Sequence, residues 1–205
     1  SDSKPIARVY RIVAEMKGIT LLLTCLVCCS NIGSICGNSP KVCISGLSCV
    51  LGRYISGNES DSFEAFLGIP YAKPPIGNLR FSNPQEVELW NGTLSALYPM
   101  SDCMQRNYLL LPDSISGSED CLYLNIYRPL NNTEKLPVMF YIHGGGFFAG
   151  SPSPSEEGPQ YFMDTSDVIL VVAAYRLGPF GFISTNDEQM TGNYGLKDQK
   201  LALQW

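Results

Sequence analysis

The chain has 205 residues, of which 45% are hydrophobic and 16% are charged, and its formal net charge is −5. This composition is typical of a single globular domain and excludes a disordered chain. The acidic balance argues against nucleic acid as a partner, because a nucleic-acid-binding face needs an excess of Lys and Arg.

The amino-terminal part of the chain has the pattern of a secretory leader. A basic residue precedes an apolar run at 19–29, and small residues follow this run. That order is typical of a signal peptide, and the run is too short for a membrane span, which takes about 20 apolar residues. We therefore expect upstream or leader sequence at 1–15, a signal peptide at 16–36, one secreted domain at 37–205, and no membrane span.

The cysteines and glycosylation sequons that follow the leader agree with export. Four cysteines remain after residue 36, and an even number in a secreted chain favours disulfides. Cys43 and Cys49 flank the turn-forming pair Ser45-Gly46 between two short predicted strands, so we expect them to bridge a hairpin. Asn-Xaa-Ser/Thr sequons lie in polar, turn-like stretches and begin at Asn58, Asn91 and Asn131.

Hydrophobic patterning predicts the main strands. A small antiparallel section is expected at about 41–69, followed by core strands at 121–128, 137–143 and 168–175. The last two strands are apolar enough for a sheet that is covered on both faces. A helix is predicted at 195–205, with Leu201 and Trp205 on the same face.

Three consecutive glycines, Gly144, Gly145 and Gly146, follow directly on the apolar strand at 137–143. Because glycine has no Cβ, a ligand can approach the peptide N–H groups of such a segment closely. In acyl transfer, each N–H that meets the developing oxyanion contributes about 3 to 4 kcal/mol to transition-state stabilisation. A His-Gly-Gly-Gly loop has this role in lipases and esterases. The tripeptide alone is equally consistent with a turn that only reverses the chain.

Six sequence blocks in one order resolve that ambiguity. They read FLGIPYAKPP at 66–75, NLRF at 78–81, SEDCLYLNI at 118–126, YIHGGGFF at 141–148, YRLGPFGF at 175–182 and GNYGLKDQ at 192–199. With these blocks the chain resembles the type-B carboxylesterase and cholinesterase family from about Cys43 to Trp205. The resemblance implies an α/β-hydrolase fold. We expect its incomplete amino-terminal part: a small antiparallel hairpin region followed by core strands of a mostly parallel sheet.

The resemblance assigns the glycine loop to an oxyanion hole. It implies that Gly145 and Gly146 donate the N–H groups, while His143 and Gly144 support the loop. In this family the nucleophilic serine, the acid and the catalytic histidine come later, and no Gly-Xaa-Ser-Xaa-Gly occurs up to Trp205. We therefore expect an amino-terminal fragment that carries no catalytic triad and is inactive alone, with no metal ion and no cofactor.

The resemblance also implies three structural pairs. A disulfide is expected to join Cys103 and Cys121. A buried or half-buried ion pair is expected behind that disulfide loop, between Arg80 and Glu119. A second ion pair is expected to tie the strand end at 175 to the helix at 195–205, between Arg176 and Asp198.

For the intact protein, the resemblance implies a secreted serine esterase that acts on a carboxylic ester through an acyl-enzyme. Cholinesterases place a tryptophan on the disulfide-closed loop, where its ring holds a quaternary ammonium. No tryptophan lies between Cys103 and Cys121, which favours a general carboxylesterase. The alternative is a non-catalytic adhesion or binding protein with the same fold, and the intact glycine loop favours the enzyme. A truncated secreted product is a third reading.

Overall fold

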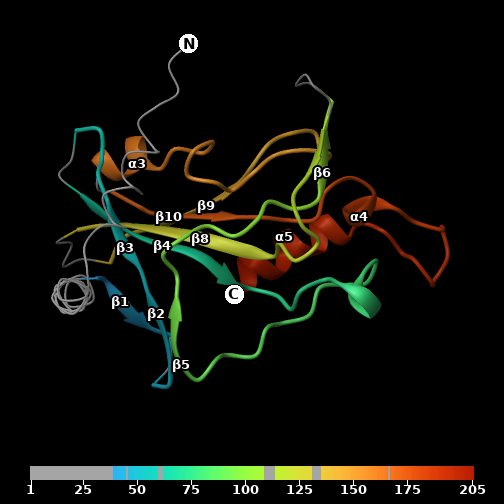
Figure 1. The fold of residues 1–205 in the computed structure, drawn as a ribbon, viewed down its shortest axis with the longest axis horizontal. Coiled ribbons are helices and arrows are strands. Elements are labelled where there is room, and N and C mark those ends of the chain that lie inside the picture. The colour runs from blue at the N-terminus through green and yellow to red at the C-terminus, as the bar shows by residue number, and fades with distance from the viewer. Residues whose placement is uncertain (1–38, 45, 60–61, 109–113, 131–134, 166) are drawn as a thin grey trace, which may run out of the picture. The chain divides into compact units, whose positions relative to one another are not determined.

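The computed structural model describes most of the chain after the expected leader (Figure 1). The described ranges are 39–44, 46–59, 62–108, 114–130, 135–165 and 167–205. From Pro40 to Trp205 these residues form one compact unit. The expected leader and signal peptide, at 1–15 and 16–36, and the sequon residue Asn131 lie outside the described residues.

A small three-stranded sheet contains the predicted hairpin. Its strands, in spatial order, are β1 (Lys41–Cys43), β2 (Ser48–Leu51) and β5 (Gly92–Ser95). β1 and β2 are antiparallel, and β5 runs parallel to β2. Cys43 lies directly opposite Cys49 in the hairpin register, and a disulfide joins the two residues.

The main sheet has five strands in the order β3-β4-β8-β10-β9. Their bounds are β3 (Arg53–Ile55), β4 (Phe63–Pro70), β8 (Tyr123–Pro129), β9 (Val138–Ile142) and β10 (Ile169–Ala173). Among these described strands only β10 and β9 are parallel neighbours, and the other three pairs are antiparallel. The expectation of a mostly parallel sheet is therefore wrong for this part of the chain. Parallel neighbours need a long crossover, which here is the segment between β9 and β10 with helix α3 (Gln160–Thr165).

Strand β9 lies at the edge of this sheet. β10 inserts between β8 and β9, so β9 pairs with β10 on one side and with no described strand on the other. Its side chains are also accessible, contrary to the expectation of a strand covered on both faces: Val138 is 63% exposed and Ile142 is 40% exposed. The apolar composition of β9 predicted burial, but the described elements that pack on its faces leave these side chains accessible.

The remaining elements connect the sheets. They are η1 (Gly77–Leu79), the antiparallel pair β6 (Gln105–Asn107) and β7 (Ser114–Ser116), α4 (Gly178–Phe182) and α5 (Tyr194–Gln204). The predicted helix at 195–205 is confirmed as α5, although Trp205 caps its end and is 40% exposed. Leu201 is partly buried against the core.

The hydrophobic core divides between the two faces of the main sheet. Ile69, Leu122 and Leu124 belong to one cluster, and Phe63 and Tyr127 belong to the other. Strand β4 contributes to both clusters because its residues alternate between the faces. A register irregularity interrupts its pairing with β8 between residues 66 and 69, so the backbone deviates there from a regular ladder.

The buried side chain of Asn125 fixes this irregularity. Its Oδ1 accepts a hydrogen bond from the Gly68 N–H at 2.9 Å, and its Nδ2 donates to the Pro152 carbonyl at 2.8 Å. Asn125 therefore links the sheet to the segment that follows the glycine loop. This contact anchors the candidate site to the core.

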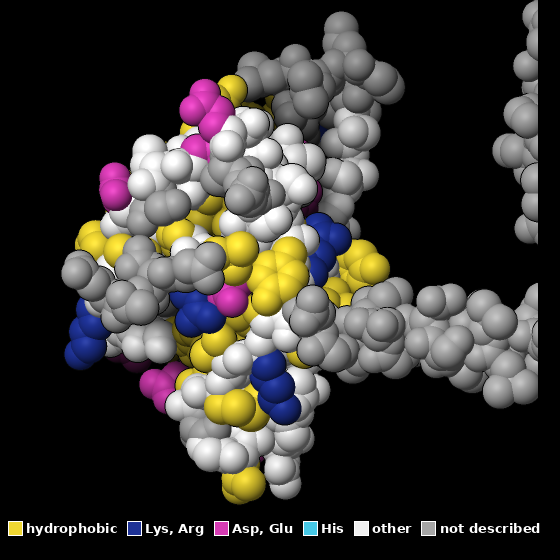
Figure 2. All heavy atoms as spheres, turned by 90° about the vertical axis from the view of Figure 1, so that its left-hand side faces the viewer, with side chains coloured by type: hydrophobic (Ala, Val, Ile, Leu, Met, Phe, Trp, Pro, Cys, Tyr) yellow, Lys and Arg dark blue, Asp and Glu magenta, His cyan; other side chains and the backbone are white. Residues whose placement is uncertain are grey.

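One side of the molecule exposes apolar surface. Figure 2 shows hydrophobic side chains gathered on the side where β1, β3 and α3 lie in Figure 1. An open hollow of about 310 Å³ lies between the hairpin and the main sheet, and residues from both line it, including Val42, Val50, Phe66, Ile126 and Val171. Separately, no helix in the described ranges is both long and apolar enough to cross a membrane.

Candidate active site

The glycine loop leaves the end of β9 and folds back at once. The N–H groups of Phe148 and Ala149 donate to the Gly145 carbonyl at 3.2 and 3.1 Å, which closes a tight turn. Gly145 and Gly146 have φ angles of +110° and +62°, values that residues other than glycine rarely adopt. A Cβ on Gly145 would lie 1.9 Å from the Ala149 carbonyl oxygen. The turn therefore requires glycine at this position.

The peptide N–H groups of the loop are accessible to a ligand. Gly144, Gly145 and Gly146 are all exposed. Among the described residues, the N–H groups of Gly145 and Gly146 have no hydrogen-bond acceptor. Two adjacent, unoccupied donors can together bind a negatively charged oxygen.

Phe147 continues the loop in a strained backbone conformation. Its φ is +66°, which is uncommon for an aromatic residue. The Phe147 carbonyl accepts a hydrogen bond from Gly178, the first residue of α4, at 2.7 Å. Its ring packs near Phe182 and Tyr175, with centroid separations of 5.1 and 6.4 Å. These contacts hold a conformation that would otherwise relax, as is common near functional sites.

His143 is buried beneath the loop and contacts Gly144 and Tyr175. Its Nδ1–H donates to the Gly144 carbonyl at 2.9 Å, and its ring stacks on Tyr175 with a centroid separation of 4.5 Å. The Tyr175 hydroxyl donates in turn to the His143 carbonyl at 3.0 Å. Burial lowers the pKa of His143, while the bond to Gly144 acts in the opposite direction. The ring therefore stays neutral and orients the backbone.

This lowered pKa predicts a pH-dependent stability. The pKa of folded His143 lies below its ordinary value of 6.5, so the neutral ring contributes fully above pH 6.5 and that contribution is lost as the pH falls through the folded pKa. The unfolding free energy of the protein, measured by urea titration between about pH 8 and pH 5, should fall more steeply than that of His143→Gln. Parallel pH profiles of the two proteins would contradict a buried, neutral His143.

Two polar contacts, from Gln105 in the disulfide-closed loop and from Asp102 just before it, hold the end of the glycine loop. Gln105 bonds both the N–H and the carbonyl of Gly150, at 2.8 and 2.9 Å. Asp102 accepts a hydrogen bond from the Ser151 hydroxyl at 2.5 Å. Sequence reasoning missed these residues because the partners are more than 40 positions apart. The glycine at 150, four residues after Gly146, was the available signal.

An open cavity of about 220 Å³ adjoins the loop. Phe148 links the loop to the cavity. Its ring lies so close to Gly146 that a Cβ there would be 2.7 Å from it, and Phe148 also lines the cavity. Tyr108 meets Phe148 edge to face at a centroid separation of 5.8 Å. The other lining residues are Met104, Gln105, Arg106, Ile115, Gly178, Pro179 and Phe180. Most of this wall is apolar, so it suits an uncharged hydrocarbon group.

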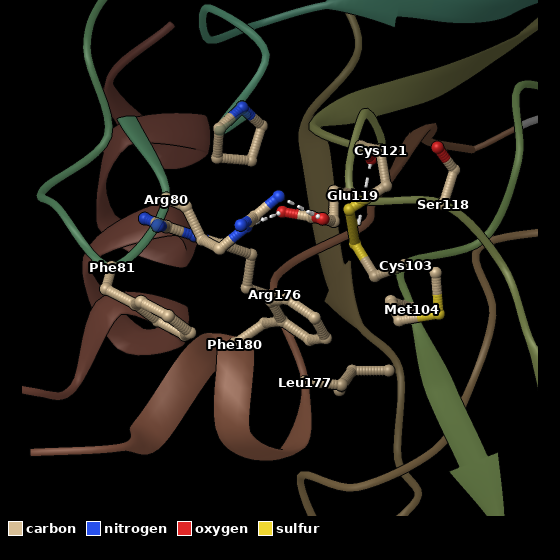
Figure 3. Close-up of a pocket in the computed structure, with 11 residues that line it drawn as sticks. Arg80, Phe81, Cys103, Met104, Ser118, Glu119, Cys121, Arg176, Leu177 and Phe180 are labelled. Carbon is tan, nitrogen blue, oxygen red and sulfur yellow. Dashed lines mark hydrogen bonds and ion pairs between the residues drawn. A yellow bond between two sulfur atoms is a disulfide. The ribbon is translucent and has the colours of Figure 1, made fainter. Parts of the chain in front are cut away.

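Arg80 and Glu119 lie together beside the second disulfide (Figure 3). The guanidinium and the carboxylate form a two-point contact, with Nη2 to Oε1 at 2.7 Å. Their side chains are 43% and 22% exposed, so the pair is half-buried and partly screened by solvent. Cys103 and Cys121 are both buried and joined by a disulfide, so the loop that carries Gln105 is closed covalently.

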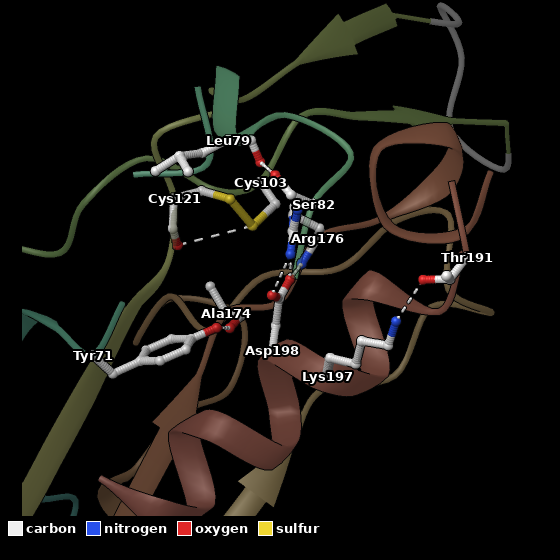
Figure 4. Close-up of polar contacts among 10 residues, drawn as sticks. All are labelled: Tyr71, Leu79, Ser82, Cys103, Cys121, Ala174, Arg176, Thr191, Lys197 and Asp198. Carbon is white, nitrogen blue, oxygen red and sulfur yellow. Dashed lines mark hydrogen bonds and ion pairs between the residues drawn. A yellow bond between two sulfur atoms is a disulfide. The ribbon is translucent and has the colours of Figure 1, made fainter. Parts of the chain in front are cut away.

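Arg176 and Asp198 form a fully buried ion pair (Figure 4). Their side chains are 3% and 0% exposed, and the guanidinium bonds both carboxylate oxygens at 2.7 and 2.8 Å. The Arg176 N–H also donates to Asp198 at 3.0 Å. Burial raises the pKa of Asp198, and the contacts with Arg176 oppose that rise. The pair ties the segment after β10 to α5.

The two sequon asparagines in the described part of the chain are accessible. Asn58 is exposed, and Asn91 is exposed immediately before β5. Both side chains therefore meet the first physical requirement for an N-linked glycan.

Comparisons with known proteins agree on one relationship. A profile described as the carboxylesterase family matches residues 38–205. The chain is 48% identical over 157 residues to the juvenile hormone esterase of Tribolium castaneum, covering 76% of this chain and 26% of that relative. It is 46% identical over 172 residues to the carboxylic ester hydrolase of Bombus ignitus, covering 82% and 30%. It is also 46% identical over 162 residues to venom carboxylesterase-6 of Apis mellifera, covering 76% and 28%. The chain spans less than a third of the length of these relatives.

Proposed function

The chain belongs to the carboxylesterase family, and on that premise we propose that the protein is a carboxylic-ester hydrolase working through an acyl-enzyme. The observation that carries the proposal is the pair of exposed, unoccupied N–H groups at Gly145 and Gly146. A turn that only reversed the chain would not need to present two adjacent donors to solvent. The relatives that are named as esterases support the same reaction class.

In the proposed mechanism these donors act on charge that develops during the reaction. A serine oxygen attacks the ester carbonyl carbon, the carbonyl electron pair moves onto oxygen, and Gly145 and Gly146 stabilise the oxyanion. Collapse of this intermediate expels the alcohol, and water then hydrolyses the acyl-enzyme. We propose that the serine, the acid and the general-base histidine follow Trp205, because no Gly-Xaa-Ser-Xaa-Gly occurs in this sequence. His143 is buried under the loop and does not serve as the base.

The proposed substrates are esters with an uncharged, apolar group. The cavity beside Gly146 is walled mainly by apolar side chains, including Phe148 and Tyr108. No tryptophan lies between Cys103 and Cys121 to hold a quaternary ammonium. Both features favour a general carboxylesterase over an enzyme for choline esters.

We also propose that the protein is secreted. The signal-peptide pattern at 16–36 motivates this proposal. The two disulfides support it, since disulfides persist in oxidising compartments. The exposed sequon residues Asn58 and Asn91 are consistent with glycosylation in the secretory pathway.

A serine-directed organophosphate tests the proposed function. The full-length protein that contains this chain should hydrolyse p-nitrophenyl esters and be labelled on one serine, because the reagent traps the nucleophile that the oxyanion donors serve. Mass spectrometry of the labelled peptide should place that serine outside residues 1–205. A label on a serine within 1–205 would contradict the proposed arrangement. Absence of both turnover and label would favour the alternative, a non-catalytic adhesion or binding protein.

A further inference from the structure

Gln105 makes an unusually complete contact with the glycine loop. Its side-chain Oε1 accepts the Gly150 N–H at 2.8 Å, and its Nε2 donates to the Gly150 carbonyl at 2.9 Å. Nε2 also donates to the backbone carbonyl of Cys103, a member of the second disulfide, at 3.3 Å. Only a side chain with an acceptor and a donor on the same carbon can satisfy both groups of one residue in this way.

The position of Gly150 is transmitted directly to the oxyanion donors. Gly150 has a φ of +129°, and a Cβ there would lie 2.3 Å from His143 Nδ1 and 2.4 Å from the Gly144 carbonyl oxygen. The backbone of Gly150 is therefore packed against the two residues that immediately precede Gly145. A displacement of Gly150 toward them has no free space to absorb it, so the loop must shift.

We propose that Gln105 is a positioning residue for acyl transfer, which fixes the far end of the glycine loop and ties it to the loop closed by Cys103 and Cys121. This inference rests on the proposed function. Gln105 touches neither the reacting carbonyl nor the oxyanion, and acts through Gly150. Its effect is on how well the N–H groups of Gly145 and Gly146 are oriented when the oxyanion forms.

The neighbouring contact explains why this role is separable from folding. Ser151 is buried and donates to Asp102 at 2.5 Å, and Asn125 holds the carbonyl of Pro152. The chain after Gly150 therefore remains anchored when Gln105 is changed. The expected defect is a loosened loop in a folded protein.

The test uses Gln105→Glu and Gln105→Ala in the full-length protein that contains this chain. Glu keeps the size of the side chain but removes the Nε2 donor, so an oxygen would face the Gly150 carbonyl. Each variant should lower kcat for p-nitrophenyl esters about tenfold or more while KM stays within about twofold, since the lost interaction is one made in the transition state. The affinity for a trifluoromethyl ketone, which forms an oxyanion with the serine, should fall by a similar factor.

Gln189→Glu is the matched control, because Gln189 is exposed on a loop outside this network. It should leave kcat, KM and inhibitor affinity unchanged. Gln105 also lines the apolar cavity, so acetate and hexanoate esters are compared. A positioning role predicts equal losses of kcat for both esters. A raised KM confined to hexanoate would overturn the proposal and make Gln105 a wall of the cavity.

The remaining outcomes also decide the question. An active wild type whose Gln105 variants retain full kcat would overturn the positioning role and leave the proposed function standing. A wild type that hydrolyses no ester would overturn both. If Gln105→Ala does not fold, Gln105→Glu carries the kinetic comparison. Misfolding of both variants, judged by urea denaturation, would make Gln105 a stability residue and overturn the proposal.

Discussion

Replacing Gly146 with valine should lower kcat/KM for ester hydrolysis by about a hundredfold or more. The φ of Gly146 is +62°, and a Cβ at this position would lie 2.7 Å from the Phe148 ring. A β-branched residue strains both the backbone and that contact, so the N–H group is displaced from the oxyanion position. Stopped-flow measurement of acylation would show the loss in the chemical step, while labelling by an organophosphate would be slowed and still reach completion.

Gly144→Ala provides the comparison within the same loop. A Cβ on Gly144 meets nothing within 4 Å, and its φ lies outside the left-handed region. Its loss in kcat/KM should therefore be much smaller than that of Gly146→Val. Equal losses in the two variants would show that the loop tolerates no side chain at all, and would contradict a specific donor role for Gly146.

The Asp198→Asn substitution should destabilise the protein by about 3 to 5 kcal/mol. Asparagine cannot neutralise Arg176, whose side chain is 3% exposed and is held by two bonds to the carboxylate. The substitution leaves a positive charge buried without compensation, which is the costly outcome for such a pair. Urea or guanidinium unfolding, followed by fluorescence and circular dichroism, measures the change.

Two controls distinguish this interpretation from a general sensitivity to charge changes. Glu88→Gln breaks the exposed ion pair between Glu88 and Lys73, whose side chains are 90% and 40% exposed respectively. This substitution should change the unfolding free energy little. The double variant Arg176→Met with Asp198→Leu removes both buried charges and should recover part of the loss. A destabilisation by Asp198→Asn no larger than that of Glu88→Gln would refute the buried pair.

Local features of this fold could be predicted from the sequence. The hairpin disulfide between Cys43 and Cys49 depends on a short turn, and α5 depends on a continuous helical segment. Motif resemblance brought together Arg176 and Asp198, because both lie inside blocks whose spacing is specific. In each case the signal lies within a few residues or within a recognisable block.

Features that depend on strand order could not be predicted in this way. The apolar sequence of β9 is compatible with an edge or a central position, and only the insertion of β10 next to β8 decides between them. Likewise, Gln105 bonds the backbone of Gly150 across 45 positions, and a contact to a peptide group leaves no complementary side chain to read. The pattern of hydrophobic residues along the sequence indicates local secondary structure, whereas these contacts depend on the tertiary arrangement.

The connectivity of the two disulfides has a consequence for biosynthesis. The bridges join Cys43 to Cys49 and Cys103 to Cys121, so the four cysteines after residue 36 pair in sequence order, the first with the second and the third with the fourth. A chain that enters an oxidising compartment from its amino terminus can close each bridge as soon as the second cysteine emerges. The formation of each bridge is independent of the cysteines of the other bridge. When the bridges form in that order, closure of the loop that holds the glycine segment needs no exchange of thiols between the two bridges.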